Sequence, residues 1–486
     1  MILQSSNKIP KWLYTRAIQY YFLVLAVVSL LFFSHHLNLG WIIIGTIEIL
    51  VFFGFGSKLI QDWREERMRS VRVFERKIFK YGLYFRLFAV MAIYWGFMLY
   101  YDDAFGFENA DATYYEDVGR ELANAIRSGG FIGTWTTYYQ TTDLSDMGYF
   151  TYLSFIYFIF EGDYSVLIPR LINCCVSAYT VILIYRLAKR NFGEQVGRMA
   201  AIFVMLWPNF WFYCGTQLKE PWMTFLFVLY AEQSDQMLRS RQFTAWKIVP
   251  LILLVVLMLT LRTPLALVMI LALLFATVMS SSRVVGWGKR VIVGILAVAL
   301  LAVTMGNRME EQARELMNQA RSGQQEQNME WRSRRENGNT FAKYASRSVF
   351  APLIFTIPFP TMVETPNQYD LKIVNGGNFC KNIMSGFTIF ALIVLLLSGE
   401  WREHLIPLAL MLGYVIVLAL STFAQSERFH QPVVPFEMMF AADGIVYLVQ
   451  HRKRKTYLQL ASLWYIGIVV ICIAWQWFKL AGRGMA

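Results

Sequence analysis

Long apolar segments recur along almost the whole chain, and they constrain its fold more than any other feature. Thirteen of them approach the roughly 20 helical residues needed to cross a hydrocarbon core of about 30 Å. Charged residues make up only 16% of the sequence, against about 25% in soluble proteins. We therefore predict an all-α polytopic membrane protein with about 13 transmembrane helices. The predicted spans are 18–36, 41–60, 83–101, 165–185, 198–214, 219–235, 247–262, 264–281, 290–306, 384–398, 405–422, 431–449 and 457–478.

Two further apolar stretches are left out of this count. The stretch 149–160 has twelve residues, a length typical of a re-entrant or interfacial helix. The stretch 348–363 is interrupted by Pro352, Pro358 and Pro360, each of which removes a backbone donor that lipid cannot replace. Whether either stretch enters the membrane stays open.

Basic residues decide the predicted orientation. With thirteen spans, the Lys- and Arg-rich segments all fall on one side of the membrane, and cytoplasmic loops carry such an excess. The N-terminus is then cytoplasmic, the C-terminus lies outside, and a bacterial inner membrane is the expected location. The formal net charge of +12 is explained by these loops, so no nucleic-acid partner is expected. The basic segments are 8–16, 61–82, 186–198, 239–247, 283–290, Arg402 and 451–455.

The predicted spans divide the chain into four parts. Residues 1–82 form an N-terminal two-helix addition with a basic cytoplasmic segment. Residues 83–306 form a transmembrane core that includes an outer loop at 102–164. Residues 307–383 form a larger outer helical region, and residues 384–486 form the C-terminal transmembrane helices.

The outward loops hold the residues that could do chemistry. Asp111 is expected at the head of an amphipathic juxtamembrane helix, where a carboxylate could accept a proton or cap the helix. In YCGTQLKEPW, Lys219 and Glu220 stand at the mouth of a span, with Pro221 suited to its first turn. They are either ligands, or a snorkelling lysine and a partner of the helix dipole.

Isolated cations lie on the same side. Arg428 and His430 occur in the turn AQSERFHQPVVPF, and the outward position of Arg428 runs against the inward preference for cations. Its guanidinium could bind two phosphate oxygens, pair with Glu427 or reach lipid headgroups. Arg170 and Arg262 lie at other outer span ends, where each is either an interfacial anchor or a ligand. Together with the carboxylates, these cations fit a lipid-phosphate substrate that approaches from the bilayer.

Common catalytic motifs are absent from the sequence. It contains no phosphate-binding loop of the type G-x-x-x-x-G-K-[ST], no G-x-S-x-G and no H-E-x-x-H. Its five histidines form no metal-ligand pattern. Nucleotide hydrolysis and zinc chemistry therefore have no support.

Three sequence blocks resemble the polyprenyl-phosphate-sugar-dependent glycosyltransferases of the C-type membrane fold (GT-C). This family includes protein O-mannosyltransferases and the bacterial aminoarabinose transferase of lipid A. The first block, DATYYEDVGREL at 111–122, resembles the family's D-E-x-x-Y-x-x-x-A-R helix at Asp111 and Tyr115, with Ala112 in place of the second acid. The third, ERFHQPVVPF, is similar to R-Y-x-x-P-x-x-P at Arg428.

The second block runs through FEGDYSVLIPRL, YRLAKRNFGEQVGRMAA and WPNFWFYCGTQLKEP. It resembles the family's F-G…R-L, L-A-R-R-x-F-G and x-P…-D/E succession in order and spacing. The resemblance covers roughly residues 83 to 449. The matching positions in this block are Arg170, Phe192, Gly193, Pro208 and Glu220.

The resemblance implies transfer of a sugar on the outer face, from a polyprenyl-phosphate-linked donor to a lipid, glycan or protein acceptor, with inversion at the anomeric carbon. Asp111 would be the general base or orient the acceptor. Glu220 would hold the acceptor or a cation, and Arg428 and Arg170 would hold the departing lipid phosphate, with Lys219 added because it adjoins Glu220. A divalent cation on Asp111 and Glu220 is left undecided.

Two other functions compete with this one. A surface-polysaccharide polymerase or ligase would also use polyprenyl carriers outside the cell, and the Arg-rich segment 306–347 could hold its pyrophosphate-linked donor. A transporter or flippase would instead need charges at mid-span and inverted repeats. The sequence shows no internal symmetry, and most of its candidate charges lie at the outer ends of spans.

Overall fold

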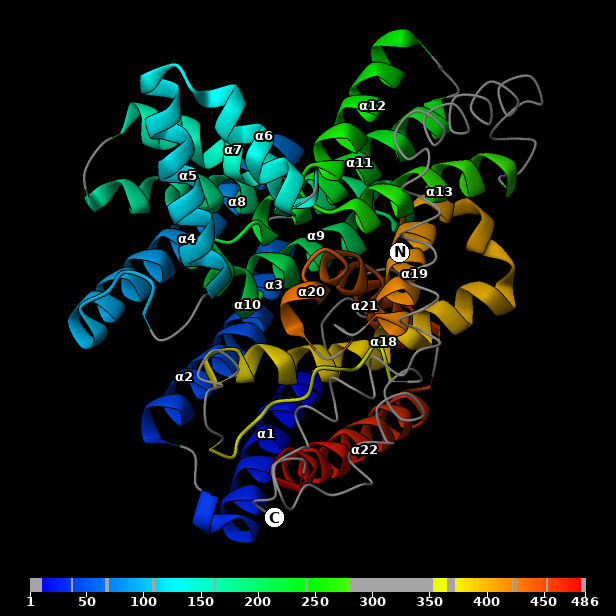
Figure 1. Cartoon of the computed structure of the whole chain (residues 1–486). Coiled ribbons are helices and arrows are strands. Elements are labelled where there is room, and N and C mark those ends of the chain that lie inside the picture. The colour runs from blue at the N-terminus through cyan, green and yellow to red at the C-terminus, as the bar shows by residue number, and fades with distance from the viewer. Residues whose placement is uncertain are drawn as a thin grey trace.

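The computed structural model of the chain is built from helices. All regular secondary structure in the part of the chain that it describes is helical, as the sequence predicts, and Figure 1 shows how these helices are arranged. The residues described are 11–35, 38–65, 70–106, 110–142, 144–160, 163–240, 244–279, 353–364, 372–421, 424, 426–451 and 453–481.

Several helices are long and apolar enough to cross a membrane, which makes the chain a multi-pass helical membrane protein. Three shorter apolar helices, at Trp246–Leu259, Thr263–Met279 and Leu405–Leu420, coincide with further predicted spans. The predicted span 290–306 lies outside the residues described. The six full-length candidates are Leu13–Leu31, Leu39–Trp63, Val71–Tyr101, Leu167–Phe192, Asn375–Ser398 and Lys455–Ala481.

The predicted span 198–214 is not one helix. Its first helix ends at Met205 and its second begins at Pro208. Proline lacks the backbone N–H that would continue the hydrogen-bond ladder, and it disfavours the helical conformation of the residue before it. Trp207 accordingly has extended backbone angles. Each half is shorter than a bilayer requires.

The N-terminal helices pack against the C-terminal ones. The first helix lies along the last and the second lies along α18, and these four form the lower part of Figure 1. The helix α4 is continuous across residues 82 and 83, where the sequence suggests a boundary. These helices are α1 (Lys11–Leu31), α2 (Leu39–Ile49), a π-helical turn (Leu50–Phe55), α3 (Gly56–Glu65), α4 (Val71–Tyr101), α18 (Asn375–Ser398) and α22 (Arg454–Ala481).

The segment predicted as the first outer loop folds into three helices that sit together at one end of the molecule (Figure 1). They are α5 (Ala110–Ser128), α6 (Phe131–Thr142) and α7 (Leu144–Ile159). The helix expected at Asp111 thus begins at Ala110. The helix α7 contains the twelve-residue apolar stretch 149–160 and packs on α5, which explains why this stretch is apolar.

The centre of the molecule is the group of helices around α8. That helix contacts α4, α9 and α11, while α21 contacts α9 and α18. Tyr185, Trp207 and Phe436 are among its fully buried side chains. These helices are α8 (Leu167–Phe192), α9 (Glu194–Met205), α10 (Pro208–Gly215), α11 (Glu220–Ser240), α12 (Ala245–Leu259), α13 (Thr263–Met279), α19 (Leu405–Leu420), α20 (Glu427–His430) and α21 (Val434–His451).

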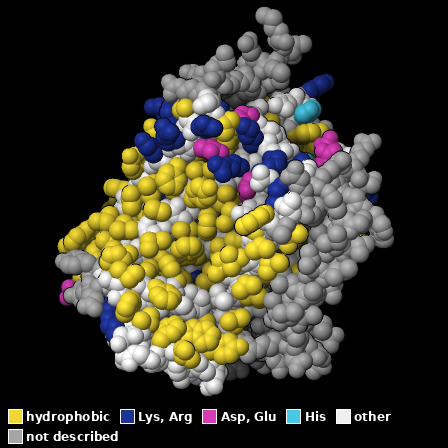
Figure 2. Space-filling view, turned by 90° about the horizontal axis from the view of Figure 1, so that it is seen from above, with side chains coloured by type: hydrophobic (Ala, Val, Ile, Leu, Met, Phe, Trp, Pro, Cys, Tyr) yellow, Lys and Arg dark blue, Asp and Glu magenta, His cyan; other side chains and the backbone are white. Residues whose placement is uncertain are grey.

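The surface carries large exposed apolar side chains. Phe88, Leu99 and Leu397 are 77%, 85% and 84% exposed, and all three lie on helices that could cross a membrane. Figure 2 shows a face on which hydrophobic side chains form a broad surface, with Lys and Arg gathered near one border. An apolar face of this extent with a charged border is what a bilayer requires.

Candidate active site at the start of α11

Three charged side chains from distant parts of the sequence meet at the start of α11. Arg428 donates through Nη1 to Asp111 Oδ2 and through Nε to Glu220 Oε1. These partners lie 317 and 208 residues away in the sequence. We call Arg428, Asp111 and Glu220 the Arg428 cluster.

Helix ends place these three side chains. Asp111 lies in the first turn of α5 and Glu220 in the first turn of α11, where a negative charge interacts favourably with the positive end of the helix dipole. Pro221 in the first turn of α11 needs no backbone donor there. Arg428 belongs to the four-residue helix α20, ahead of α21.

The members of the Arg428 cluster differ in exposure. The Glu220 side chain is 1% exposed and that of Arg428 is 16% exposed, whereas that of Asp111 is 57% exposed. Burial alone would lower the pKa of Arg428, but Glu220 and Asp111 more than offset it and raise the pKa well above its usual value. The cluster therefore presents a permanent cation with one buried and one accessible carboxylate.

Lys219 is buried beside this cluster and does not snorkel to the surface. Its ammonium group forms an ion pair with Asp146 and donates to the carbonyl oxygen of Leu261 at 2.7 Å. It also lies 5.9 Å from the ring centre of Tyr115, whose hydroxyl donates to Asp146 at 3.3 Å.

Arg262 completes the positive side of the site. Its guanidinium lies 4.5 Å from the ring centre of Phe429, and the guanidinium of Arg428 lies 5.7 Å from the same centre. Cations over an aromatic face are attracted by its electron density. The structure thus brings together Asp111, Glu220, Arg428, Lys219, Tyr115 and Arg262.

Two other candidate ligands do not join this group. Arg170 is buried and donates from Nη2 to the carbonyl of Ala104 at 2.9 Å, beneath the turn that follows α4. His430 faces away from the site: its Nδ1 lies 2.7 Å from Lys381 Nζ and its Nε2 donates to Ala424 O at 2.9 Å. Burial, with the charge of Lys381, lowers the pKa of His430 well below its usual value, so it is a neutral packing residue.

Asp146 is the main residue that sequence reasoning missed. It lies in the first turn of α7 and binds both Lys219 and Tyr115. In the sequence it is one of nine acids between 102 and 148. Its position at the start of an apolar helix, like that of Asp111, is the signal that could have singled it out.

A second buried polar group, also missed, lies next to the site. Glu116 accepts hydrogen bonds from Tyr157 and Gln217, and it pairs with Arg120 one turn along α5. Gln217 has a positive φ of 29°, a conformation that is strained for a residue with a side chain. These contacts fix the turn that leads into Lys219 and Glu220.

The two carboxylates that could hold a divalent cation both contact an arginine. Asp111 and Glu220 both direct an oxygen at Arg428, so the chain's own guanidinium lies where a shared cation would bind. Among the residues for which side chains are described, no group of three His, Cys, Asp or Glu side chains is close enough to hold a metal.

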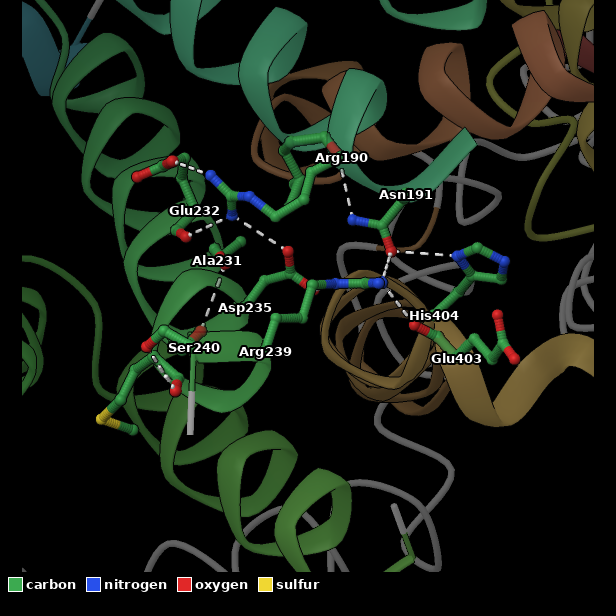
Figure 3. A network of polar contacts seen from close by, with 12 residues as sticks. Arg190, Asn191, Ala231, Glu232, Asp235, Arg239, Ser240, Glu403 and His404 are labelled. Atoms are coloured by element: carbon green, nitrogen blue, oxygen red, sulfur yellow. Dashed lines mark hydrogen bonds and ion pairs between the residues drawn. The ribbon is translucent and has the colours of Figure 1, made fainter. Parts of the chain in front are cut away.

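A different charged network lies at the other end of α8 and α11 (Figure 3). Arg190 pairs with Glu232 and with Asp235, the latter at 3.0 Å. Asp235 also pairs with Arg239, which donates to Asn191 at 2.7 Å and to the Glu403 carbonyl. We call this the Arg190 network. It joins helix ends whose loops contain three of the predicted basic segments.

Comparison with known proteins adds no assignment. No model of a known protein family matches the chain, and no curated protein matches it. The class that fold and site define is a helical membrane protein with a charged site at one end of its helices. Its activity has to be argued from that site.

Proposed function

We propose that the chain is a membrane glycosyltransferase of the C-type fold that transfers a sugar from a polyprenyl-phosphate donor to a lipid, glycan or protein acceptor. The observation that carries this proposal is Arg428 held between Asp111 and Glu220, with Lys219 and Arg262 beside them. The site would face the periplasm, and the remaining predicted spans would complete thirteen.

The cations suit an anionic leaving group. When the bond between the anomeric carbon and the phosphate oxygen breaks, the phosphate gains negative charge, and fixed positive charge at that position lowers the barrier. Arg428 can bind two phosphate oxygens through its planar guanidinium. Glu220 holds that guanidinium through Nε, which leaves its other edge to turn toward the substrate.

The exposed carboxylate suits the base. Asp111 is the accessible partner of Arg428, so an incoming phosphate can replace it with a smaller desolvation cost than Glu220 would require. Released from Arg428, Asp111 takes the proton of the acceptor hydroxyl. The acceptor oxygen then attacks the anomeric carbon from the side opposite the phosphate, which leaves as polyprenyl phosphate with inversion.

The variant Asp111→Asn tests this function. It keeps the shape of the side chain and removes the base, so transfer in membranes supplied with polyprenyl-phosphate sugars should fall by about 100-fold or more. Asp117→Asn, an exposed acid on the same helix, is the matched control and should keep full transfer. Full activity of Asp111→Asn at equal expression would refute the assigned base.

One observation favours a transporter as a second candidate. Arg86 in α4 and Lys381 in α18 are fully buried charges within helices that could cross a membrane, and such charges often mark a transport path. Mass spectrometry of the lipid that co-purifies with the protein separates the two functions. Bound polyprenyl phosphate supports the enzyme, whereas purified protein free of it favours transport.

The polymerase alternative depends on 306–347, which lies outside the described residues. Preference for a pyrophosphate-linked oligosaccharide as donor would favour it.

A further inference from the structure

A small cavity lies beside Glu220, between α8, α10, α11 and the residue that follows α20. It has room for roughly one water-sized occupant. Six of its lining side chains carry oxygen atoms, and its other walls are the ring of Phe210 and a proline. The six are Ser177, Thr180, Tyr213, Glu220, Thr224 and Gln431.

Three of these oxygens are buried with no hydrogen-bond partner in the described part of the chain. They are Glu220 Oε2, Thr224 Oγ1 and Gln431 Oε1. The residues themselves are 1%, 3% and 1% exposed. An unsatisfied buried polar atom costs about 1–3 kcal/mol, and more when it is charged. Three such atoms around one cavity therefore indicate an occupant that binds oxygen.

The hydrogen bonds that the lining side chains already make leave several of their oxygens available as acceptors. Gln431 Nε2 donates to the carbonyl of Glu427 at 3.0 Å, so the other terminal atom of this amide, the acceptor Oε1, is the one without a described partner. Thr180 donates its hydroxyl to Val176 O at 3.0 Å, so its lone pairs stay available. Ser177 Oγ already accepts from Arg86 Nε at 2.7 Å, and the Tyr213 hydroxyl donates to Glu427 Oε1 at 3.1 Å. The other four oxygens can all act as acceptors.

We propose that this cavity is a sodium site formed by Glu220, Thr224, Gln431 and Thr180. Oxygen ligands suit hard cations. Calcium and magnesium sites generally draw on several carboxylates or substrate phosphates, whereas this cavity contains a single carboxylate, which is shared with Arg428. The small volume favours Na⁺ over the larger K⁺. The ion would fix Glu220 from behind and so hold Arg428 in place. The site does not depend on the proposed transferase activity.

The test is the thermal unfolding of the purified full-length protein in four salts. Its melting temperature is measured in NaCl, LiCl, KCl and choline chloride at equal ionic strength. An ion that binds only the native state stabilises it by RT ln(1 + [Na⁺]/Kd), so Na⁺ at about ten times its Kd should raise the melting temperature by about 3 °C over choline. KCl should match choline chloride.

Variants locate the effect. Thr224→Val and Gln431→Leu should each abolish the difference between NaCl and choline chloride. Thr136→Val, which changes an exposed threonine on α6, should keep it. Equal melting temperatures of the unaltered protein in all four salts would overturn the proposal, as would a full sodium response in both cavity variants. If the variants do not fold, the binding of radioactive sodium to the unaltered protein is measured at equilibrium instead. Saturation at less than about one ion per chain would also overturn the proposed sodium site.

Discussion

The two charged groups at opposite ends of α11 have similar composition but differ in how fully their members are bonded. In the Arg190 network, Glu232 and Asp235 are both paired and none of its side-chain atoms is among the unsatisfied atoms of the described residues. In the Arg428 cluster, Glu220 keeps an oxygen without a described partner and Asp111 is more than half exposed. The first group ties helices together, whereas the second retains capacity to bind a ligand.

Arg428→Gln should produce the largest effect. If the guanidinium stabilises the departing phosphate, its removal should lower transfer by about 100- to 1000-fold. The matched control is Arg186→Gln. Arg186 also pairs with a carboxylate, Glu75 at 2.7 Å, but it lies near the C-terminal end of α8, away from the Arg428 cluster. Turnover assays on both variants at equal protein concentration make the measurement. Equal losses in the two variants would contradict a specific role of Arg428 in transfer.

Arg190→Gln should affect stability and leave the chemistry intact. It would take from Glu232 the cation with which it pairs and leave Asp235 with Arg239 alone, and breaking a buried ion pair by removing one partner is costly. Because the Arg190 side chain is 24% exposed, we expect a loss of about 2 kcal/mol, between the buried and surface limits. Denaturant unfolding in detergent measures it. Lost transfer in the protein that remains folded would contradict the structural role.

His404 makes the Arg190 network sensitive to acid. Burial, and secondarily Arg239, lower the pKa of His404 to about 4, below its usual value near 6.5. The unfolded chain therefore takes up a proton first as pH falls, so stability is fully present above about pH 6.5 and declines toward pH 4. We expect a loss on the order of 1 kcal/mol at pH 5. Thermal unfolding at pH 7 and 5 should show a smaller difference in His404→Gln; an unchanged difference would exclude this histidine.

Tyr115→Phe should have the smallest effect. It removes only the 3.3 Å hydrogen bond to Asp146, and a bond of this kind contributes about 0.5–1.5 kcal/mol. Transfer should fall by about tenfold at most. The Michaelis constant and the turnover number, measured separately, show whether the loss lies in binding or in chemistry. A loss as large as that of Arg428→Gln would mean that the Tyr115 hydroxyl acts directly.

The sequence predicted much of the fold because apolar segments of membrane length are a strong signal. From loop charge it also predicted that Asp111, Glu220 and Arg428 lie on one side of the membrane, and the structure brings these three side chains into contact. It did not predict that the segment 198–214 breaks at Pro208, although the effect of proline on its neighbour points there.

Side-chain direction explains why two of the candidate ligands lie apart from the site. His430 follows Arg428 by two residues in α20, and residues two apart on a helix do not share a face, so the helix turns it toward Lys381. Arg170 points toward the turn after α4. Its guanidinium packs near the rings of Tyr94 on α4 and Phe105 in that turn, and it donates a hydrogen bond to the backbone of the turn. Such directions follow from packing between distant helices, which sequence patterns do not specify.

Binding of polyprenyl monophosphate tests the central claim most directly. The purified protein, Arg428→Gln and Arg186→Gln would each be titrated with this lipid in nanodiscs and followed by native mass spectrometry. We predict binding to the unaltered protein and to Arg186→Gln, and at least a tenfold weaker affinity for Arg428→Gln, which corresponds to about 1.4 kcal/mol. Equal binding by all three proteins would contradict the account.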